Sequence, residues 1–257
     1  MKDIFNADTI GRGLNTNIIG KKIIFYESIS STNEIAREKS REGANEGTTI
    51  IAGEQVGGRG RFKRHWETPA GNIALSVILY PSIERLPYLI MIAAVGVCRS
   101  IEIVTGLKTG IKWPNDILIN GKKVCGILIE NEIDHEGKVI SITGIGINTG
   151  LQPADYEEIK TMATSLEKEL GQKVSRADIT RSLLEELDRL YILQDDQATY
   201  EAWRERMITT GQPVTITWKN GSIEGIAEDV DESGALIIRL GDGTLHTVVA
   251  GDVTLRK

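Results

Sequence analysis

The stretch GGRGRFKRHW, residues 57–66, concentrates four permanent cations and three glycines in one short loop. The preceding run TTIIA, residues 48–52, is typical of a buried strand, and NIALSVIL, residues 72–79, predicts a second strand. Because the basic loop lies between two apolar strands, we interpret it as part of a folded site. Guanidinium groups bind oxyanions through paired hydrogen bonds, and glycine amides can join them. The loop therefore predicts a phosphate or carboxylate site, with Trp66 offering a flat face to a purine.

Composition limits the classes of partner. The chain has 257 residues and a formal net charge of -6, which argues against general nucleic-acid binding. Taken alone, however, the basic loop is equally compatible with a solvated segment or a nucleic-acid contact. The length allows one large domain, or a large domain with a small one.

Cysteine and histidine usage predicts a reduced, intracellular protein without a structural metal. Cys98 and Cys125 do not form a C-x-x-C pair, and none of the three histidines has zinc-ligand spacing. The N-terminus has no hydrophobic signal core, and residues 86–104 are interrupted by Arg99 and Glu102. We therefore expect a cytoplasmic protein without a membrane span, and a core-facing helix over residues 86–104.

Short strands and tight turns follow this helix. Residues 109–113 begin the pattern, and strands over 117–119 and 124–129 flank Asn120-Gly121, a strong two-residue hairpin signal. The apolar run over residues 139–148 is interrupted by Gly144 and Gly146, and such glycines are typical of close ligand approach.

Two helices and an all-β tail complete the pattern. Ser175 is expected to cap a helix that carries an apolar stripe from Ile179 to Tyr191, and a second helix is expected over residues 198–208. Gly211-Gln212-Pro213 then ends the helical pattern. Turns at Asn220-Gly221, 231–234 and 241–243 separate short strands, which predict a small open barrel of the SH3-like type.

Five motifs together resemble the successive signature blocks of the biotin–protein ligases, also called biotin–acetyl-CoA-carboxylase ligases. They are Ser31-Thr32-Asn33, residues 57–66, Lys112-Trp113-Pro114-Asn115-Asp116, Lys123-Val124-Cys125-Gly126 and Gly144-Ile145-Gly146-Ile147-Asn148. The resemblance extends from about residue 22 to the end of the chain. It implies an α+β fold like that of class II synthetases, in which helices pack on a mixed, mainly antiparallel sheet. Residues 1–209 would form the catalytic domain and residues 210–257 the SH3-like domain.

The resemblance also implies a two-step reaction. The carboxylate of biotin attacks the α-phosphorus of ATP to give biotinyl-5′-AMP and pyrophosphate, and a lysine of a biotin carboxyl carrier domain then captures the biotinyl group. Because biotin and the phosphates repel one another, the first step needs fixed cations. Mg²⁺ is expected to arrive with the polyphosphate, since the sequence shows no dedicated carboxylate cage for a metal.

Three sets of site residues follow from the resemblance. The catalytic set is Arg61, Lys112, Asp116 and Lys123. The biotin-binding set is Ser31, Thr32, Asn33, Gln55, Arg59, Gly60, Arg61, Lys123, Gly126, Gly144 and Gly146. The ATP-binding set is Arg59, Arg61, Arg64, Trp66, Lys112, Asn115 and Asn148.

Two of these assignments have local alternatives. Ser31-Thr32-Asn33 also has the composition of a helix N-cap, and both roles are compatible because a helix start offers amides as well as hydroxyls. Asp116 resembles an aspartate that orients or deprotonates the acceptor lysine, but a Pro-Asn-Asp turn also favours aspartate for local hydrogen bonds.

DNA binding is one property in which members of the family differ. Some bacterial members carry an N-terminal helix-turn-helix that binds operator DNA; only some twenty residues precede the first strand here, so operator binding is not expected. The resemblance implies a homodimer formed through the central sheet.

A lipoate–protein ligase is the main rival function, although such ligases generally lack the doubled G-R-G-R block. A non-catalytic RNA-binding or scaffold protein is a rival from another class, which the acidic composition disfavours.

Overall fold

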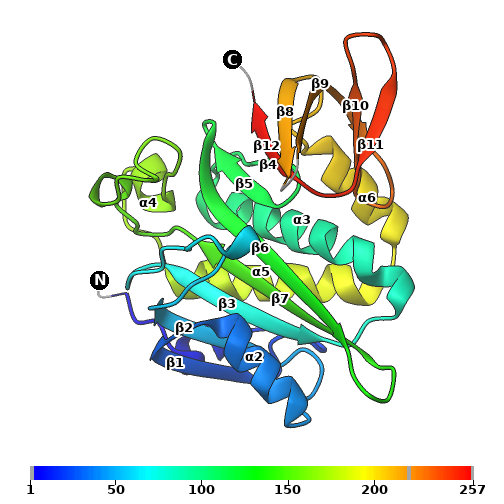
Figure 1. Ribbon diagram of the computed structural model, residues 1–257. Helices are drawn as coiled ribbons and strands as arrows, with labels where there is room; N and C mark the ends of the chain where they lie inside the picture. The colour runs from blue at the N-terminus through cyan, green and yellow to red at the C-terminus, as the bar shows by residue number, and fades with distance from the viewer. Residues whose placement is uncertain (1–2, 219–220, 256–257) are drawn as a thin grey trace.

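Two β-sheets organise the computed structural model, which describes residues 3–218 and 221–255 (Figure 1). The main sheet has seven strands in the order β1-β2-β3-β7-β6-β5-β4. Strands β1 and β2 are parallel, and the other neighbouring pairs are antiparallel. The predicted mixed, mainly antiparallel sheet is confirmed. Its strands are β1 (Ile23–Ile29), β2 (Thr49–Gln55), β3 (Ile73–Leu79), β4 (Gly110–Lys112), β5 (Asp116–Ile119), β6 (Lys122–Ile133) and β7 (Val139–Ile147).

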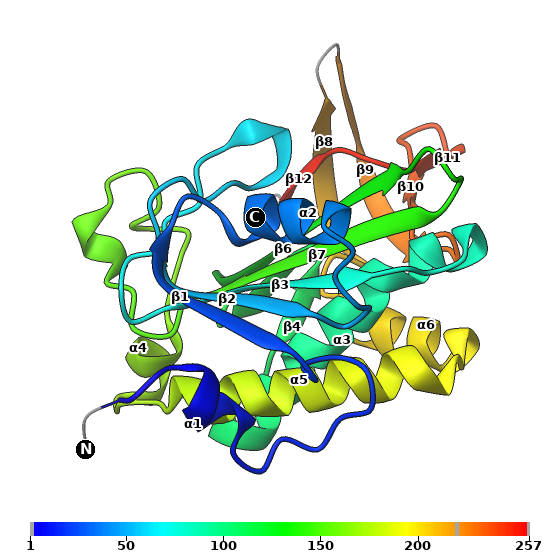
Figure 2. The ribbon, with the colours of Figure 1, turned by 90° about the horizontal axis from the view of Figure 1, so that it is seen from below.

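Helices cover both faces of the main sheet. Figure 2 shows α2 (Thr32–Arg41) on one face, and α3 (Leu86–Thr105) and α5 (Arg176–Leu193) on the other. The segment Ile83–Thr105 is long and apolar enough to cross a membrane, yet 61% of its most apolar 18-residue stretch is buried within the fold. Buried Ala93, Ala94 and Val97 face the core. The segment is therefore the core helix that the sequence predicts.

The two predicted C-terminal helices form with small differences at their ends. The Ser175 hydroxyl accepts a hydrogen bond from the Asp178 amide at 3.2 Å and caps α5, as predicted. The next helix, α6 (Asp196–Glu205), is capped by Asp195 and ends three residues before the predicted limit. It ends there because Met207 forms a β-bridge with Ile111 at the edge of the main sheet. The short helices α1 (Ala7–Gly11) and α4 (Leu166–Leu170) had no sequence prediction.

The hairpin between β5 and β6 is tight, as Asn120-Gly121 predicts. Both turn residues have left-handed backbone angles, with φ 51° for Asn120 and 75° for Gly121. A two-residue turn of this kind matches the twist of the flanking strands, and asparagine and glycine adopt it at low cost. The hairpin brings β5 and the start of β6 together.

The C-terminal segment folds into a five-stranded antiparallel sheet in the order β11-β10-β9-β8-β12. Its strands are β8 (Pro213–Trp218), β9 (Gly221–Val230), β10 (Leu236–Arg239), β11 (Leu245–Val248) and β12 (Asp252–Leu255). This arrangement is consistent with an SH3-like domain. The predicted turns at residues 231–234 and 241–243 are present, whereas Asn220 of the predicted Asn220-Gly221 turn lies outside the described residues.

The small sheet docks on the main domain through a buried tryptophan. The Trp113 indole, which is 1% exposed, donates a hydrogen bond to the Gly234 carbonyl at 2.8 Å. From α6, the Tyr200 hydroxyl donates to the Val230 carbonyl at 2.8 Å. Because Trp113 lies between β4 and β5, the small sheet is held beside this edge of the main sheet. The exact boundary at residues 209 and 210 stays a prediction.

Candidate active site

A row of small residues crosses the centre of the main sheet. Gly146 on β7 lies opposite Gly126 on β6 and opposite Ala74 on β3, and Gly126 lies opposite Asp116 on β5. Cross-strand partners in an antiparallel sheet project to the same face. Two residues along β7, Gly144 lies opposite Ser76. In the pattern Gly-Ile-Gly-Ile, residues 144–147, the two glycines therefore leave one face of β7 without side chains, and the two isoleucines lie on the opposite, apolar face.

The side chains of Trp66 and Asn33 pack directly over these glycines. A Cβ atom at Gly146 would overlap the Trp66 indole nitrogen, and one at Gly144 would overlap the Asn33 carboxamide. A Cβ atom at Gly126 would lie 3.1 Å from the Trp66 ring and 3.2 Å from Lys123 Cε. The glycines thus allow side chains to approach the sheet closely, and the predicted approach of a ligand stays a prediction. In this structure the space beside them is filled by the protein's own side chains.

Positive charge gathers at the Asp116 end of this row. Lys123 Nζ lies 2.6 Å from Asp116 Oδ1 and 5.0 Å from the centre of the Trp66 ring. Lys112 on β4 is the cross-strand partner of Asp116. Arg61 donates a hydrogen bond to Asn115 Oδ1 at 3.3 Å. Residues from β4, β5, β6 and the basic loop, remote in sequence, are thereby brought together.

Burial lowers the pKa of two of these cations. It lowers the pKa of Lys112 below 10.5, while nearby Asp116 opposes the change. It likewise lowers the pKa of Arg61, against the opposing effects of Asp252 and Asp116. Partly desolvated cations interact more strongly with an anion than cations in water do, because the local dielectric is lower. The cluster is therefore suited to hold an anionic group.

The start of α2 forms the second side of the site. Ser31 occupies the N-cap position, as the local alternative predicts, but its side chain makes no cap hydrogen bond. The Thr32 amide and hydroxyl both donate to Gln55 Oε1, at 2.8 and 3.1 Å. Ser31 and Thr32 are buried. The predicted biotin-binding residues Ser31, Thr32 and Gln55 are thus neighbours, and their ligand role stays a prediction.

A buried polar network continues from Thr32 into the sheet. The Ser76 hydroxyl lies 2.7 Å from the Thr32 hydroxyl and 2.6 Å from Asn33 Oδ1. The Asn33 amide nitrogen donates to Glu130 Oε2 at 2.7 Å. Neither Ser76 nor Glu130 was predicted from the sequence as a site residue. The lone hydroxyl in the apolar run of residues 72–79 is the one signal for Ser76.

Two ion pairs link arginines of the basic loop to distant segments of the chain. Arg59 forms an ion pair with Glu34 of α2 at 2.8 Å, and not with Asp116, around which the other cations gather. Arg64 pairs with Asp252 of β12, in the small sheet, and no local pattern reveals this partner. Gly60 contributes its amide to the Arg64 carbonyl at 2.9 Å, which closes the loop on itself.

Asn148 is fixed within the fold at the end of β7. Its backbone amide donates to the Val124 carbonyl at 2.8 Å, and its side-chain amide donates to the Thr164 carbonyl at 3.1 Å. The predicted contact with adenine stays a prediction.

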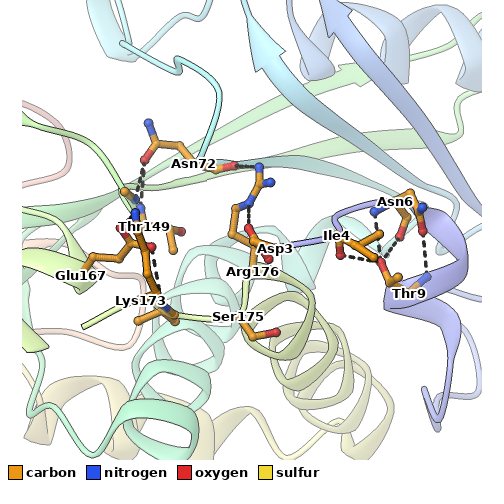
Figure 3. A network of polar contacts seen from close by, with 12 residues as sticks. Asp3, Ile4, Asn6, Thr9, Asn72, Thr149, Glu167, Lys173, Ser175 and Arg176 are labelled. Carbon is orange, nitrogen blue, oxygen red and sulfur yellow. Dashed lines mark hydrogen bonds and ion pairs between the residues drawn. The ribbon is translucent and has the colours of Figure 1, made fainter. Parts of the chain in front are cut away.

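Asn72 organises the chain immediately after Asn148. Asn72 Oδ1 accepts hydrogen bonds from the amides of Thr149, Gly150 and Leu151 at 3.0 to 3.2 Å. Figure 3 shows Asn72 between Thr149 and Arg176, whose guanidinium also pairs with Asp3. This network ties the N-terminal segment, β3 and α5 to the end of β7.

Within residues 3–218 and 221–255, no group of three histidine, cysteine or acidic side chains is placed to hold a metal ion.

Comparisons with known proteins agree on one family. Residues 25–148 match the biotin/lipoate A/B protein ligase family, and residues 209–256 match the biotin protein ligase C terminal domain. A bifunctional ligase/repressor BirA from Bacillus subtilis is 36% identical over 95% of this chain and 77% of its own length. A biotin–[acetyl-CoA-carboxylase] ligase from Mycobacterium tuberculosis is 32% identical over 94% of both chains. The structure of an Aquifex aeolicus biotin protein ligase in complex with biotin and ATP superimposes with a TM-score of 0.79 and 28% identity, covering 92% of this chain and 99% of that one.

Proposed function

Because this chain belongs to the biotin protein ligases, we propose a site at which biotin is activated with ATP and passed to a carrier lysine. The site consists of a cation cluster, Arg61, Lys112 and Lys123, and a glycine row, Gly126, Gly144 and Gly146. The enzyme is an ATP-dependent biotin–protein ligase. The observation that carries the site assignment is the convergence of Arg61, Lys112 and Lys123 around Asp116. This cluster lies beside a sheet face on which Gly126, Gly144 and Gly146 allow close approach.

In the first step, a biotin carboxylate oxygen attacks the α-phosphorus of ATP, and pyrophosphate leaves. Negative charge accumulates on the phosphoryl oxygens as the new bond forms. Arg61 and Lys112 would stabilise that charge because both are partly desolvated. Lys123 would exchange its contact with Asp116 for the carboxylate or acyl phosphate.

The second step requires an amine that has lost its proton. The carrier lysine attacks the acyl carbon of biotinyl-5′-AMP, and AMP leaves. We assign the placement of this amine, or removal of its proton, to Asp116. The Asp116 carboxylate pairs with Lys123 on the neighbouring strand, outside its own turn, which favours the functional reading over local capping.

Other residues of the site would bind the rest of the substrates. Ser31, Thr32 and Gln55 would bind the ureido ring of biotin, since their polar groups gather beside the glycine row. The nucleotide would enter as its Mg²⁺ complex. The acceptor would be a biotin carboxyl carrier domain.

Assembly and location are further proposals. We propose that the protein is a cytoplasmic homodimer that does not bind operator DNA. Cys98 and Cys125 are both free and buried, which is compatible with a reducing compartment. Sedimentation of the ligand-free and biotin-loaded protein tests the dimer, and gel-shift titration with duplex DNA tests operator binding.

Exchange of labelled pyrophosphate into ATP tests the first step. We expect biotin-dependent exchange in wild type and a loss of about 100-fold or more in Lys123→Ala, because a fixed cation at the reacting group would be gone. Lys122→Ala is the matched control, since it removes the neighbouring lysine on the same strand. Equal activity in Lys123→Ala and Lys122→Ala would remove Lys123 from the mechanism. Exchange that depends on lipoate instead of biotin would change the substrate.

A further inference from the structure

In this structure the basic loop keeps Trp66 over the glycine row. The Trp66 ring fills the space beside Gly126 and Gly146, where the proposed function requires biotin to approach the sheet. Trp66 must therefore move before biotin enters. Because Trp66 is carried by residues 57–66, the position of this ring depends on what holds that loop.

The loop conformation is unfavourable for its own sequence. Phe62 and Lys63 have φ of 55° and 60°, a left-handed conformation that non-glycine residues seldom adopt. Three backbone hydrogen bonds close the loop internally. The Gly60 amide donates to the Arg64 carbonyl and the Trp66 amide to the Gly58 carbonyl, each at 2.9 Å, and the Arg64 amide donates to the Arg61 carbonyl at 3.2 Å. These bonds alone tie the loop only to itself, so contacts outside it must keep it against the sheet.

Arg64 provides one such contact, and its partner belongs to the other domain. The Arg64 guanidinium pairs with the carboxylate of Asp252, which begins β12 and lies 188 residues further along the chain. The Asp252 charge also acts on Arg61 and Lys112. A single carboxylate of the small sheet therefore faces the cations that the proposed function assigns to the phosphates of ATP.

We propose that Asp252 is a positioning residue that occupies the place of a nucleotide phosphate on Arg64, and so holds the basic loop closed, with Trp66 over the glycine row, until substrate displaces it. The proposal rests on the proposed function for the identity of the substrate. The small domain thereby takes part in substrate entry, because its carboxylate and the polyphosphate compete for the same guanidinium.

The expected effect is modest because the ion pair is partly exposed. The Arg64 side chain is 66% exposed and that of Asp252 is 28% exposed. Exposed pairs of this kind change an equilibrium by up to about fivefold. Neutralising Asp252 should therefore shift the loop toward its open form by about two- to fivefold, and should ease nucleotide binding by a similar factor.

Limited trypsin digestion of the ligand-free, full-length protein tests the loop directly. Cleavage after Lys63 and Arg64, identified by mass spectrometry, should be about two- to fivefold faster in Asp252→Asn than in wild type. Asp252→Glu should restore slow cleavage, because it keeps the charge. Glu232→Gln removes an exposed acid elsewhere in the same small domain and should leave cleavage unchanged. Equal rates in wild type and Asp252→Asn would overturn the proposal.

Steady-state kinetics test the competition. Asp252→Asn should lower the KM for ATP about two- to fivefold and leave kcat unchanged. A raised KM would show that Asp252 helps Arg64 to bind the nucleotide, and would overturn the proposal. Absence of biotin-dependent exchange in wild type would instead overturn the proposed function, while the digestion experiment would still decide whether Asp252 holds the loop.

Discussion

Lys112 shows how a single half-buried charge links stability to substrate binding. Burial lowers its pKa below 10.5, and Asp116 on the adjacent strand only partly compensates. The folded, ligand-free protein therefore releases this proton at a lower pH than the unfolded chain does. Between the two pKa values the unfolded chain binds more protons, so the contribution of Lys112 to stability rises with pH.

Nucleotide affinity should change in the opposite direction. The proposed role of Lys112 requires the charged ammonium, so the KM for ATP should rise as pH increases through its lowered pKa. Measuring this KM from pH 7.5 to 10 in wild type and in Lys112→Arg checks the prediction, because arginine stays charged throughout that range. An identical alkaline rise in Lys112→Arg would assign it to another group.

The sequence indicated which cations lie close together, but not every residue with which they form ion pairs. Lys112 and Asp116, in one motif, must lie close together, and the structure pairs Lys123 and Arg61 with the same motif. Their catalytic roles stay predictions. Asp252 could not be found in this way, because its contact with Arg64 depends on how two domains dock and leaves no local pattern.

At the scale of the element, β7 combines two environments along one strand. Ile145 and Ile147 are buried in the core, while Gly144 and Gly146 face side chains from α2 and the basic loop. The interruption of the apolar run by two glycines predicted close approach of a ligand. It did not predict which side chains would cover the glycines, because Asn33 and Trp66 come from segments more than 70 residues away in the sequence.

Alanine at the two glycines should have different consequences. In Gly144→Ala the new methyl group displaces Asn33, whose buried carboxamide bonds Ser76 and Glu130, so the free energy of unfolding should fall by about 1–3 kcal/mol. In Gly146→Ala the methyl group meets Trp66 on a surface loop that can swing away, so the loss should stay below about 1 kcal/mol. Urea unfolding of both variants measures the difference. Equal losses would show that the basic loop yields no more readily than α2.

Element boundaries were predictable where a chemical signal marks them. The Ser175 cap and the Asn120-Gly121 turn lie where the sequence placed them. Helices α1 and α4 have five residues each, too few to show a helical period, and were missed for that reason.

At the scale of the whole molecule, the chain is acidic but concentrates cations where two domains meet. The net charge of -6 coexists with a basic loop held between α2 and the small sheet. Composition alone therefore argues against general nucleic-acid binding but does not reveal an anion site. The order of the motifs along the sequence carried the information that composition lacks.

Ligand-dependent stability tests the molecule as a unit and separates biotin from lipoate. A ligand present at 100 times its Kd adds about 2.7 kcal/mol to the free energy of unfolding. For a chain of this length, that amount raises Tm by roughly 5–10 °C. We expect such a shift with biotin and Mg²⁺-ATP together, since the adenylate would contact both the glycine row and the cation cluster, and little shift with lipoate and Mg²⁺-ATP. Differential scanning calorimetry at matched ligand concentrations measures both. A larger shift with lipoate would assign the pocket to a lipoyl substrate and leave the adenylation chemistry in place.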